Sequence, residues 1–124
     1  MIYLDTHVMV KLWLGSVEDL GTAGRTAISE QELVVSPAAV LELELLHEIR
    51  RLQPTAKSLV ATLSEQFGVH VCDLPFSTVM YQALAEKWGR DPFDRLIVAN
   101  ARANDAGLVT KDEKIRRHYS RAIW

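Results

Sequence analysis

The chain has 124 residues, of which 48% are hydrophobic and 24% are charged. This composition is typical of one globular domain and excludes a disordered or fibrous protein. The net charge of −2 excludes a uniformly basic nucleic-acid binder, although it averages over local clusters. No apolar run approaches the roughly 18 residues of a membrane span, no signal peptide is visible, and the single cysteine cannot form an internal disulfide. We therefore expect one cytoplasmic domain, residues 1–124, with no membrane partner.

In the first half of the chain, short apolar runs alternate with helical patterns. Capping residues mark the helix starts, and glycine or proline marks their ends. The predicted elements are a strand at 2–4, a helix at 8–14, a short helix at about 23–29, a strand at 33–35, a helix from Ser36-Pro37 to near Leu52, and a helix at 55–67.

The second half repeats this alternation. The predicted elements are a strand at 69–72, a helix from a Ser77 cap to Gly89, a helix from Asp91-Pro92 to Gly107, a strand at 108–110, a short helix at 114–117 and an edge strand at 122–124. Alternating strands and helices favour a three-layer α/β/α sandwich around a central, mainly parallel sheet of four to five strands.

Four acidic residues fall at one edge of this predicted sheet. Asp5 and Asp112 follow strands, whereas Glu42 and Asp94 lie near the starts of helices that leave the same edge. Ligands of open parallel sheets bind beyond the carboxyl ends of the strands. The sequence therefore predicts that the four carboxylates converge there, although Asp5 and Asp112 could also simply cap helices.

Helical spacing singles out two of these acids. Asp94 shares a helix face with Ile97 and Val98, and a carboxylate on an apolar face needs a partner. Glu42 has the same setting, because Ala38, Leu45, Leu46 and Ile49 flank it on its helix. One such acid could be a salt-bridged core residue, but two at matching places favour a shared site.

Clustered carboxylates repel one another unless a cation lies between them. Oxygen ligands alone, without cysteine or histidine at zinc-like spacing, indicate Mg²⁺, with Mn²⁺ as a substitute. Such an ion can neutralise a phosphodiester, acidify a water molecule and stabilise the leaving oxygen. The acids thus predict hydrolytic cleavage of nucleic acid.

In their order along the chain, five segments together resemble the PIN-domain ribonucleases, especially the VapC-like toxins. They are Leu4-Asp5-Thr6-His7-Val8, Ser36 to Leu43, Asp91-Pro92-Phe93-Asp94-Arg95, Val109-Thr110-Lys111-Asp112 and Ile123-Trp124. Relatives with this pattern commonly have histidine before the third segment, where this chain has Gly89-Arg90, and lysine where it has Leu46.

The resemblance implies a Mg²⁺-dependent endoribonuclease, often dimeric, that is held inactive by a cognate antitoxin. It implies that the acidic metal site consists of Asp5, Glu42, Asp94 and Asp112, with Asp91 as an accessory acid. Thr6, Thr110 and Arg95 are candidates for contacts with substrate or with the metal ligands, although Arg95 could equally face solvent. A homodimer would also account for the helix at 8–14, which is apolar on all sides unless its own core buries it.

Two other interpretations remain open at this stage. A receiver-like signalling module would also bind Mg²⁺, but it needs an acid pair after its first strand and a phosphoacceptor after its third. Here Asp5 stands alone, and only Asp73 fits. The second alternative is a catalytically inactive PIN-like binding domain, against which the complete acid set argues.

Overall fold

A five-stranded parallel sheet forms the middle layer of the protein. In the computed structural model, which describes residues 1–124, the strands are arranged in the order β3-β2-β1-β4-β5. They are β1 (Ile2–Leu4), β2 (Leu33–Val35), β3 (His70–Val71), β4 (Gly107–Val109) and β5 (Ala122–Ile123). The chain runs outward from β1 to β3, then returns to β4 beside β1, so the strand order reverses between these two central strands.

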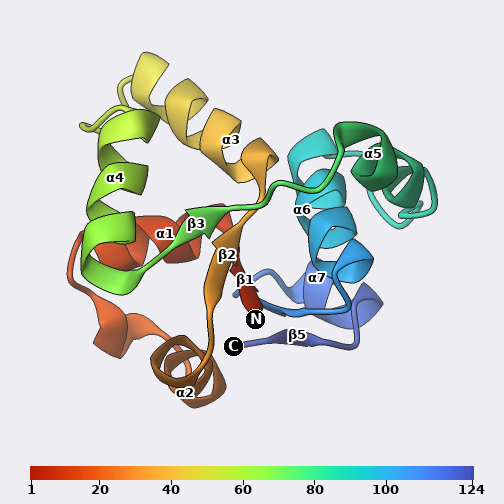
Figure 1. Ribbon diagram of the computed structural model, residues 1–124, viewed down its shortest axis with the longest axis horizontal. Helices are drawn as coiled ribbons and strands as arrows, with labels where there is room; N and C mark the ends of the chain where they lie inside the picture. Colours follow the sequence, from red (N-terminus) through yellow and green to blue (C-terminus); the bar gives the residue numbers. More distant parts are fainter.

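Seven helices cover this sheet. They are α1 (Thr6–Trp13), α2 (Thr22–Glu30), α3 (Pro37–Glu48), α4 (Ala56–Phe67), α5 (Phe76–Leu84), α6 (Pro92–Ala103) and α7 (Glu113–His118). Figure 1 shows α1, α3 and α4 grouped on one side, with α5, α6 and α7 on the other. The predicted α/β/α fold and its order of elements are confirmed. None of the helices combines the length and apolar character that crossing a membrane requires.

The core lies on both sides of β1, which explains the composition of α1. Ile2, Tyr3 and Leu4 are almost completely buried. Three residues of α1, Val8, Met9 and Leu12, pack against the same core. The apolar residues of α1 are therefore largely buried within the subunit. This helix does not present an apolar face that would need a second subunit to cover it.

Three helices end four or more residues earlier than their sequences predict. α6 was expected to reach Gly107, but it ends at Ala103, and Gly107 begins β4. α3 was expected to reach Leu52, but it ends at Glu48, and Arg50 adopts a left-handed φ of 63°. α5 was expected to start from a Ser77 cap and run to Gly89, but Pro75 precedes its first residue and it ends at Leu84. Beyond Leu84, the buried Glu86 accepts hydrogen bonds from Trp88 Nε1 (2.7 Å) and Arg102 Nε (2.5 Å). These tertiary contacts favour a loop over a longer helix.

The apolar residues around Glu42 do not form the core face of α3, which corrects the helical-wheel inference. Leu45 and Ile49 are 40% and 61% exposed, whereas the helix buries Ala39 and Leu43. Spacing alone cannot distinguish a face that packs inward from an apolar face that is left on the surface. Glu42 lies at the boundary between the two faces.

Candidate active site

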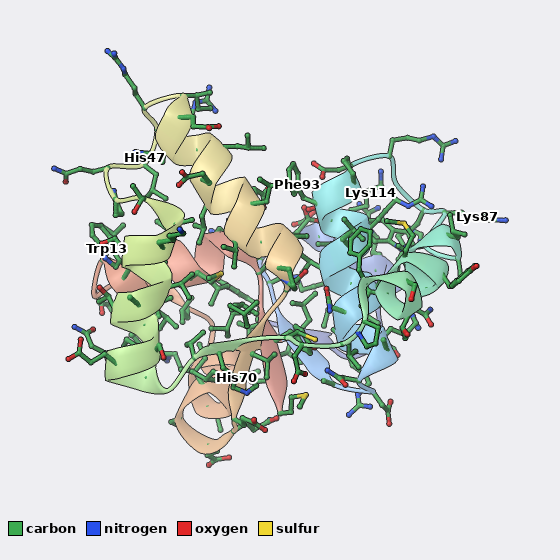
Figure 2. All side chains as sticks on the ribbon, turned by 45° about the horizontal axis from the view of Figure 1, so that its top comes forward. Trp13, His47, His70, Lys87, Phe93 and Lys114 are labelled. Atoms are coloured by element: carbon green, nitrogen blue, oxygen red, sulfur yellow. The ribbon has the colours of Figure 1, made fainter.

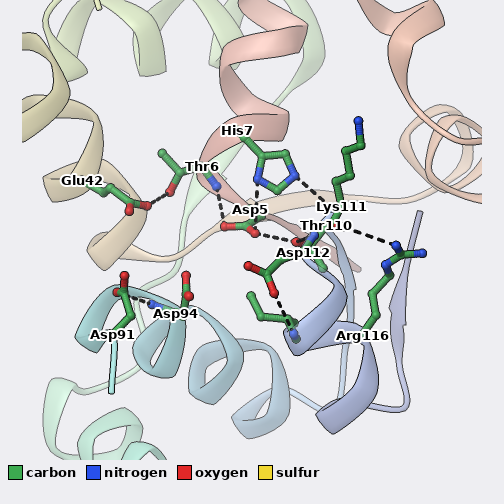
Figure 3. Close-up of polar contacts among 11 residues, drawn as sticks. Asp5, Thr6, His7, Glu42, Asp91, Asp94, Thr110, Lys111, Asp112 and Arg116 are labelled. Atoms are coloured by element: carbon green, nitrogen blue, oxygen red, sulfur yellow. Dashed lines mark hydrogen bonds and ion pairs between the residues drawn. The ribbon is translucent and has the colours of Figure 1, made fainter. Parts of the chain in front are cut away.

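The site is built where the strand order reverses. Asp5 follows β1 and Thr110 follows β4, and the backbone N–H of Asp5 donates to the Val109 carbonyl at 3.1 Å. The buried Thr110 hydroxyl donates to Asp5 Oδ2 at 2.6 Å and accepts the Asp112 N–H at 3.1 Å. One hydroxyl therefore fixes two of the predicted acids relative to each other (Figure 3).

Asp5 is almost completely buried, yet both of its carboxylate oxygens have donors. Oδ1 accepts the Thr6 N–H at 2.8 Å, and Oδ2 accepts the Thr110 hydroxyl. His7 Nδ1 lies 3.4 Å from Oδ2, while His7 Nε2 accepts the Lys111 N–H at 2.9 Å. Because Nε2 acts as an acceptor, the imidazole is neutral and its proton lies on Nδ1, facing Asp5. His7 thus has the structural, hydrogen-bonded role.

Glu42 reaches the site from α3. Ser36 caps this helix through the Ala38 N–H, and Pro37 occupies its first turn. The buried Thr6 hydroxyl donates to Glu42 Oε1. Thr6 therefore links Glu42 to Asp5, since its backbone N–H donates to one carboxylate and its hydroxyl to the other.

Asp94 comes from the first turn of α6. Asp91 Oδ1 caps this helix by accepting the N–H groups of Phe93 (2.8 Å) and Asp94 (3.2 Å). Ile97, Val98 and the next residues of this face are completely buried, as the helical spacing predicted. Asp94 stands above them with its carboxylate directed toward Asp5 (Figure 3), and it accepts no hydrogen bond from the protein.

The four acids line one cleft of about 470 Å³. Its lining residues are Asp5, Thr6, His7, Val10, Lys11, Leu14, Glu42, Leu46, Asp94 and Asp112. Leu46 belongs to its apolar wall, so Lys11 is the single lysine facing four carboxylates. Asp91 and Thr110 are not among the lining residues, since Asp91 caps α6 and Thr110 bridges Asp5 and Asp112 by hydrogen bonds.

Burial, together with the neighbouring negative charges, raises the pKa of two carboxyl groups of the site. Burial, and after it repulsion from Asp91 and the other site acids, raises the pKa of Asp94 to about 7. Burial also raises the pKa of Glu42, against the lowering effect of the Thr6 hydrogen bond. Such perturbed carboxyls in a cleft are typical of a functional site.

The chemistry of the donors fits a hard divalent cation, although the side chains do not close around one point. No three acidic, histidine or cysteine side chains come together as a ready-made set of ligands. Mg²⁺, however, commonly uses only one or two carboxylates and keeps several water molecules. A cleft that contains four carboxylates, with Asp94 unpartnered, suits this mode of binding.

One further candidate from the sequence turns away from the cleft, and one residue that lines the cleft was not predicted. Arg95 turns toward α5, where its guanidinium donates to the Ala83 carbonyl at 2.9 and 3.3 Å, and it does not line the cleft. Lys11 lines the cleft but was not predicted. Its spacing of four residues from His7, on the same face of α1, could have identified it.

Comparisons with known proteins identify the family of this chain. The family model of the PIN domain matches residues 2–120. The chain belongs to the PIN-domain family. A curated relative of this PIN domain, Ribonuclease VapC22 from Mycobacterium tuberculosis (strain ATCC 25618 / H37Rv), is 33% identical over 121 residues, which cover 94% of this chain and 91% of the relative.

Two solved structures share the fold of this PIN domain. One is the crystal structure of VapBC2 from Rickettsia felis bound to a DNA fragment from their promoter, with a TM-score of 0.66 and 18% identity over 94% of this chain and 92% of that chain. The other is a toxin-antitoxin complex from Klebsiella pneumoniae, with a TM-score of 0.69 and 13% identity over 100% of this chain and 97% of that chain.

Proposed function

We propose that this PIN domain is a metal-dependent endoribonuclease that hydrolyses RNA phosphodiester bonds as the toxin of a toxin-antitoxin pair. The observation that carries the proposal is the convergence of Asp5, Glu42, Asp94 and Asp112 on one cleft. The relative named as a ribonuclease supports RNA as the substrate. The two toxin-antitoxin structures support an antitoxin protein as the partner. We propose the cytoplasm as the place of action.

We further propose that Mg²⁺ is the cofactor, held by some of these four carboxylates, and that Mn²⁺ can replace it. When bound, this ion would supply charge neutralisation at the phosphate and a more acidic water molecule. The protein's own residues prepare the site. The Thr6 N–H and the Thr110 hydroxyl orient Asp5, and the Thr6 hydroxyl orients Glu42. Asp94 stays free of protein donors, so its oxygens are available.

Metal removal tests this function. We expect the purified protein to cleave RNA into defined fragments with Mg²⁺, to stop in EDTA, and to resume when Mg²⁺ is added back, because four carboxylates alone repel phosphate. The product of a short neighbouring gene should suppress the same cleavage. Gel analysis of end-labelled RNA provides the measurement. Cleavage that continues unchanged in EDTA would reject a metal-dependent site.

The rival receiver interpretation loses its main support in the structure. Its phosphoacceptor would be Asp73, which is exposed after the edge strand β3. Asp73 is not among the residues that line the acidic cleft. In an active receiver the phosphoacceptor lies beside the metal-binding acids, so this geometry favours the nuclease. A binding domain without activity would give no fragments in the cleavage assay.

We also propose a homodimer, which forms through a different surface from the one that the sequence suggested. Large apolar side chains remain exposed on α3 and α5, including Leu41, Leu45, Phe76 and Tyr81. A hollow of about 380 Å³ between α3, α5 and α6 contains Leu41, Phe76 and Phe93, and Figure 2 shows Phe93 between α3 and α6. Exposed apolar patches on a protein surface commonly mark contacts with other proteins.

Charge placed on this surface should separate the two subunits. We expect light scattering to give twice the mass of one chain for the wild-type protein, and the mass of one chain for Leu41→Glu, because a carboxylate would be buried at the contact. Lys57→Gln on α4 is a control that should stay dimeric, since Lys57 is exposed and does not line this hollow. A wild-type protein with the mass of one chain would contradict the proposal.

A further inference from the structure

A second hollow continues the acidic cleft on its α1 side. It has a volume of about 350 Å³ and is lined by His7, Lys11, Lys111 and Asp112. Three of these residues, His7, Lys11 and Asp112, also line the acidic cleft. The two hollows are therefore contiguous, and the charge changes from negative to positive across His7.

Lys111 is fixed at its backbone and free at its side chain. Its N–H donates to His7 Nε2 at 2.9 Å, which holds the loop between β4 and α7 against α1. Its exposed ammonium group lies 5.9 Å from the centre of the Trp124 ring, a cation–π contact that leaves its donors available. Trp124 packs tightly, because a Cβ at Gly21 would lie 2.5 Å from its backbone carbonyl carbon.

Lys11 faces the same hollow from α1. Its nearest acid is Asp19, at 3.9 Å, and 58% of the Asp19 side chain is exposed. An exposed pair at this distance contributes little stability. Neither lysine is thus committed to a strong ion pair, although the hollow holds both of them next to a site for phosphate chemistry.

The positive charge continues onto α7. Arg116 Nη2 donates to the Lys111 carbonyl at 3.4 Å (Figure 3), and a further hollow of about 430 Å³ contains Arg116, Arg117 and Glu113. A basic run is most often only a solvated face. Here, however, the basic run begins at the hollow that shares His7, Lys11 and Asp112 with the acidic cleft, and Asp112 and Glu113 are the acids interspersed in it.

We propose that Lys11 and Lys111 form a subsite for the RNA phosphate next to the scissile one, and that Arg116 extends this phosphate track. The inference rests on the proposed function for the identity of the substrate. Four carboxylates repel a polyanion, so the chain needs positive charge beside the cleft to hold the backbone. Phosphate contacts also set the register of the strand, and would therefore decide which bond reaches the acids.

Binding can be measured separately from cleavage. We expect fluorescence anisotropy with a labelled short oligouridylate in EDTA to show that Lys11→Gln/Lys111→Gln weakens binding by about tenfold or more at low salt. Each phosphate contact in a single strand contributes about 0.7 to the slope of log affinity against log salt, so the loss of two should make the slope shallower by about 1.4. Lys57→Gln, with an exposed lysine on α4, should bind as the wild type does.

The outcomes separate the two proposals. Undetectable wild-type binding, an unchanged affinity and slope in the double variant, or an equal loss in Lys57→Gln would overturn the subsite. If the double variant loses affinity for an acidic peptide but not for RNA, the surface binds protein instead of RNA, and the subsite is also overturned. If the wild type binds RNA through the lysines but does not cut it with Mg²⁺, the subsite stands and the proposed function fails.

Discussion

Replacing Asp94 by Asn, or Glu42 by Gln, should reduce kcat for RNA cleavage by about 10²–10³-fold, the loss expected when one preorganised electrostatic group is removed from an active site. Both substitutions keep the shape of the side chain and remove its negative charge. Asp94 is the acid without a protein donor, and Glu42 is held by the Thr6 hydroxyl, so both are placed to act on a cation and not only to cap a helix. Initial rates with labelled RNA in Mg²⁺ measure the effect.

Matched acids provide the controls for this experiment. Glu48→Gln changes an exposed acid near the end of the same helix as Glu42, and Asp73→Asn changes an exposed acid after β3. Both should cleave as the wild type does, with unchanged circular dichroism. Full cleavage by Asp94→Asn and Glu42→Gln, once contaminating nuclease is excluded, would disprove the site. Uptake of phosphate from a small donor at Asp73 would favour the receiver instead.

Cleavage at limiting Mg²⁺ should fall about tenfold per pH unit below about pH 7, because a proton and the cation compete for Asp94. Burial first, and then the neighbouring acids, raise the pKa of this carboxyl to about 7. Bound metal favours the ionised form, so tenfold more Mg²⁺ should move the midpoint of the pH profile toward acid by up to about one unit. If the midpoint of the pH profile does not change with the Mg²⁺ concentration, the proton and the cation do not compete for Asp94.

The free energy of unfolding should change in the opposite direction in metal-free protein. The pKa of Asp94 is above its ordinary value of 3.8 in the folded state, so this state holds the proton more tightly than the unfolded chain between about pH 4 and pH 7. Stability from this group is therefore complete below about pH 4 and decreases as the pH rises to about 7. The raised pKa of Glu42 acts in the same direction.

Asp94→Asn removes this penalty, so the variant that loses cleavage should gain stability. We expect its free energy of unfolding in EDTA at about pH 8 to exceed the wild-type value by about 1–2 kcal/mol, a figure reduced for the water that screens an open cleft. Near pH 4 the two proteins should differ little. Urea denaturation at both pH values measures the difference. Equal stability at pH 8 would show that neither burial nor the neighbouring acids penalise the ionised form of Asp94.

Features set by local chemistry could be predicted from the sequence. Apolar runs and helix-start signals identified the five strands and the seven α-helices, including α6 with its Asp91 cap and Pro92, but not the single 3-10 turn at Val17–Asp19 or the true start of α5. Asp94 was placed correctly above the buried face of α6 because α6 packs on the sheet through the residues at helical spacing. The alternation of elements predicted which strand ends share an edge, and therefore which acids could meet.

Features decided by distant contacts could not be predicted. Arg95 has no local partner in the sequence, and its direction depends on the Ala83 carbonyl near the end of α5, which also accepts the Glu86 N–H. The early end of α5 depends on the buried Glu86, which accepts hydrogen bonds from Trp88 in the following loop and from Arg102 on α6. Spacing also gave the wrong environment for Leu45 and Ile49, because an apolar residue on a helix does not reveal whether it packs within its own subunit.

The Thr110 hydroxyl joins parts of the chain that are separated by 105 residues, since it donates to Asp5. β1 and β4 become neighbours only after the segments that form β2, β3 and six of the helices have been bridged. Closing so long a loop is slow and entropically costly, and it precedes the assembly of the four acids. A partly folded chain therefore has the acids but no cleft, so a damaging nuclease activity could arise only from the complete fold.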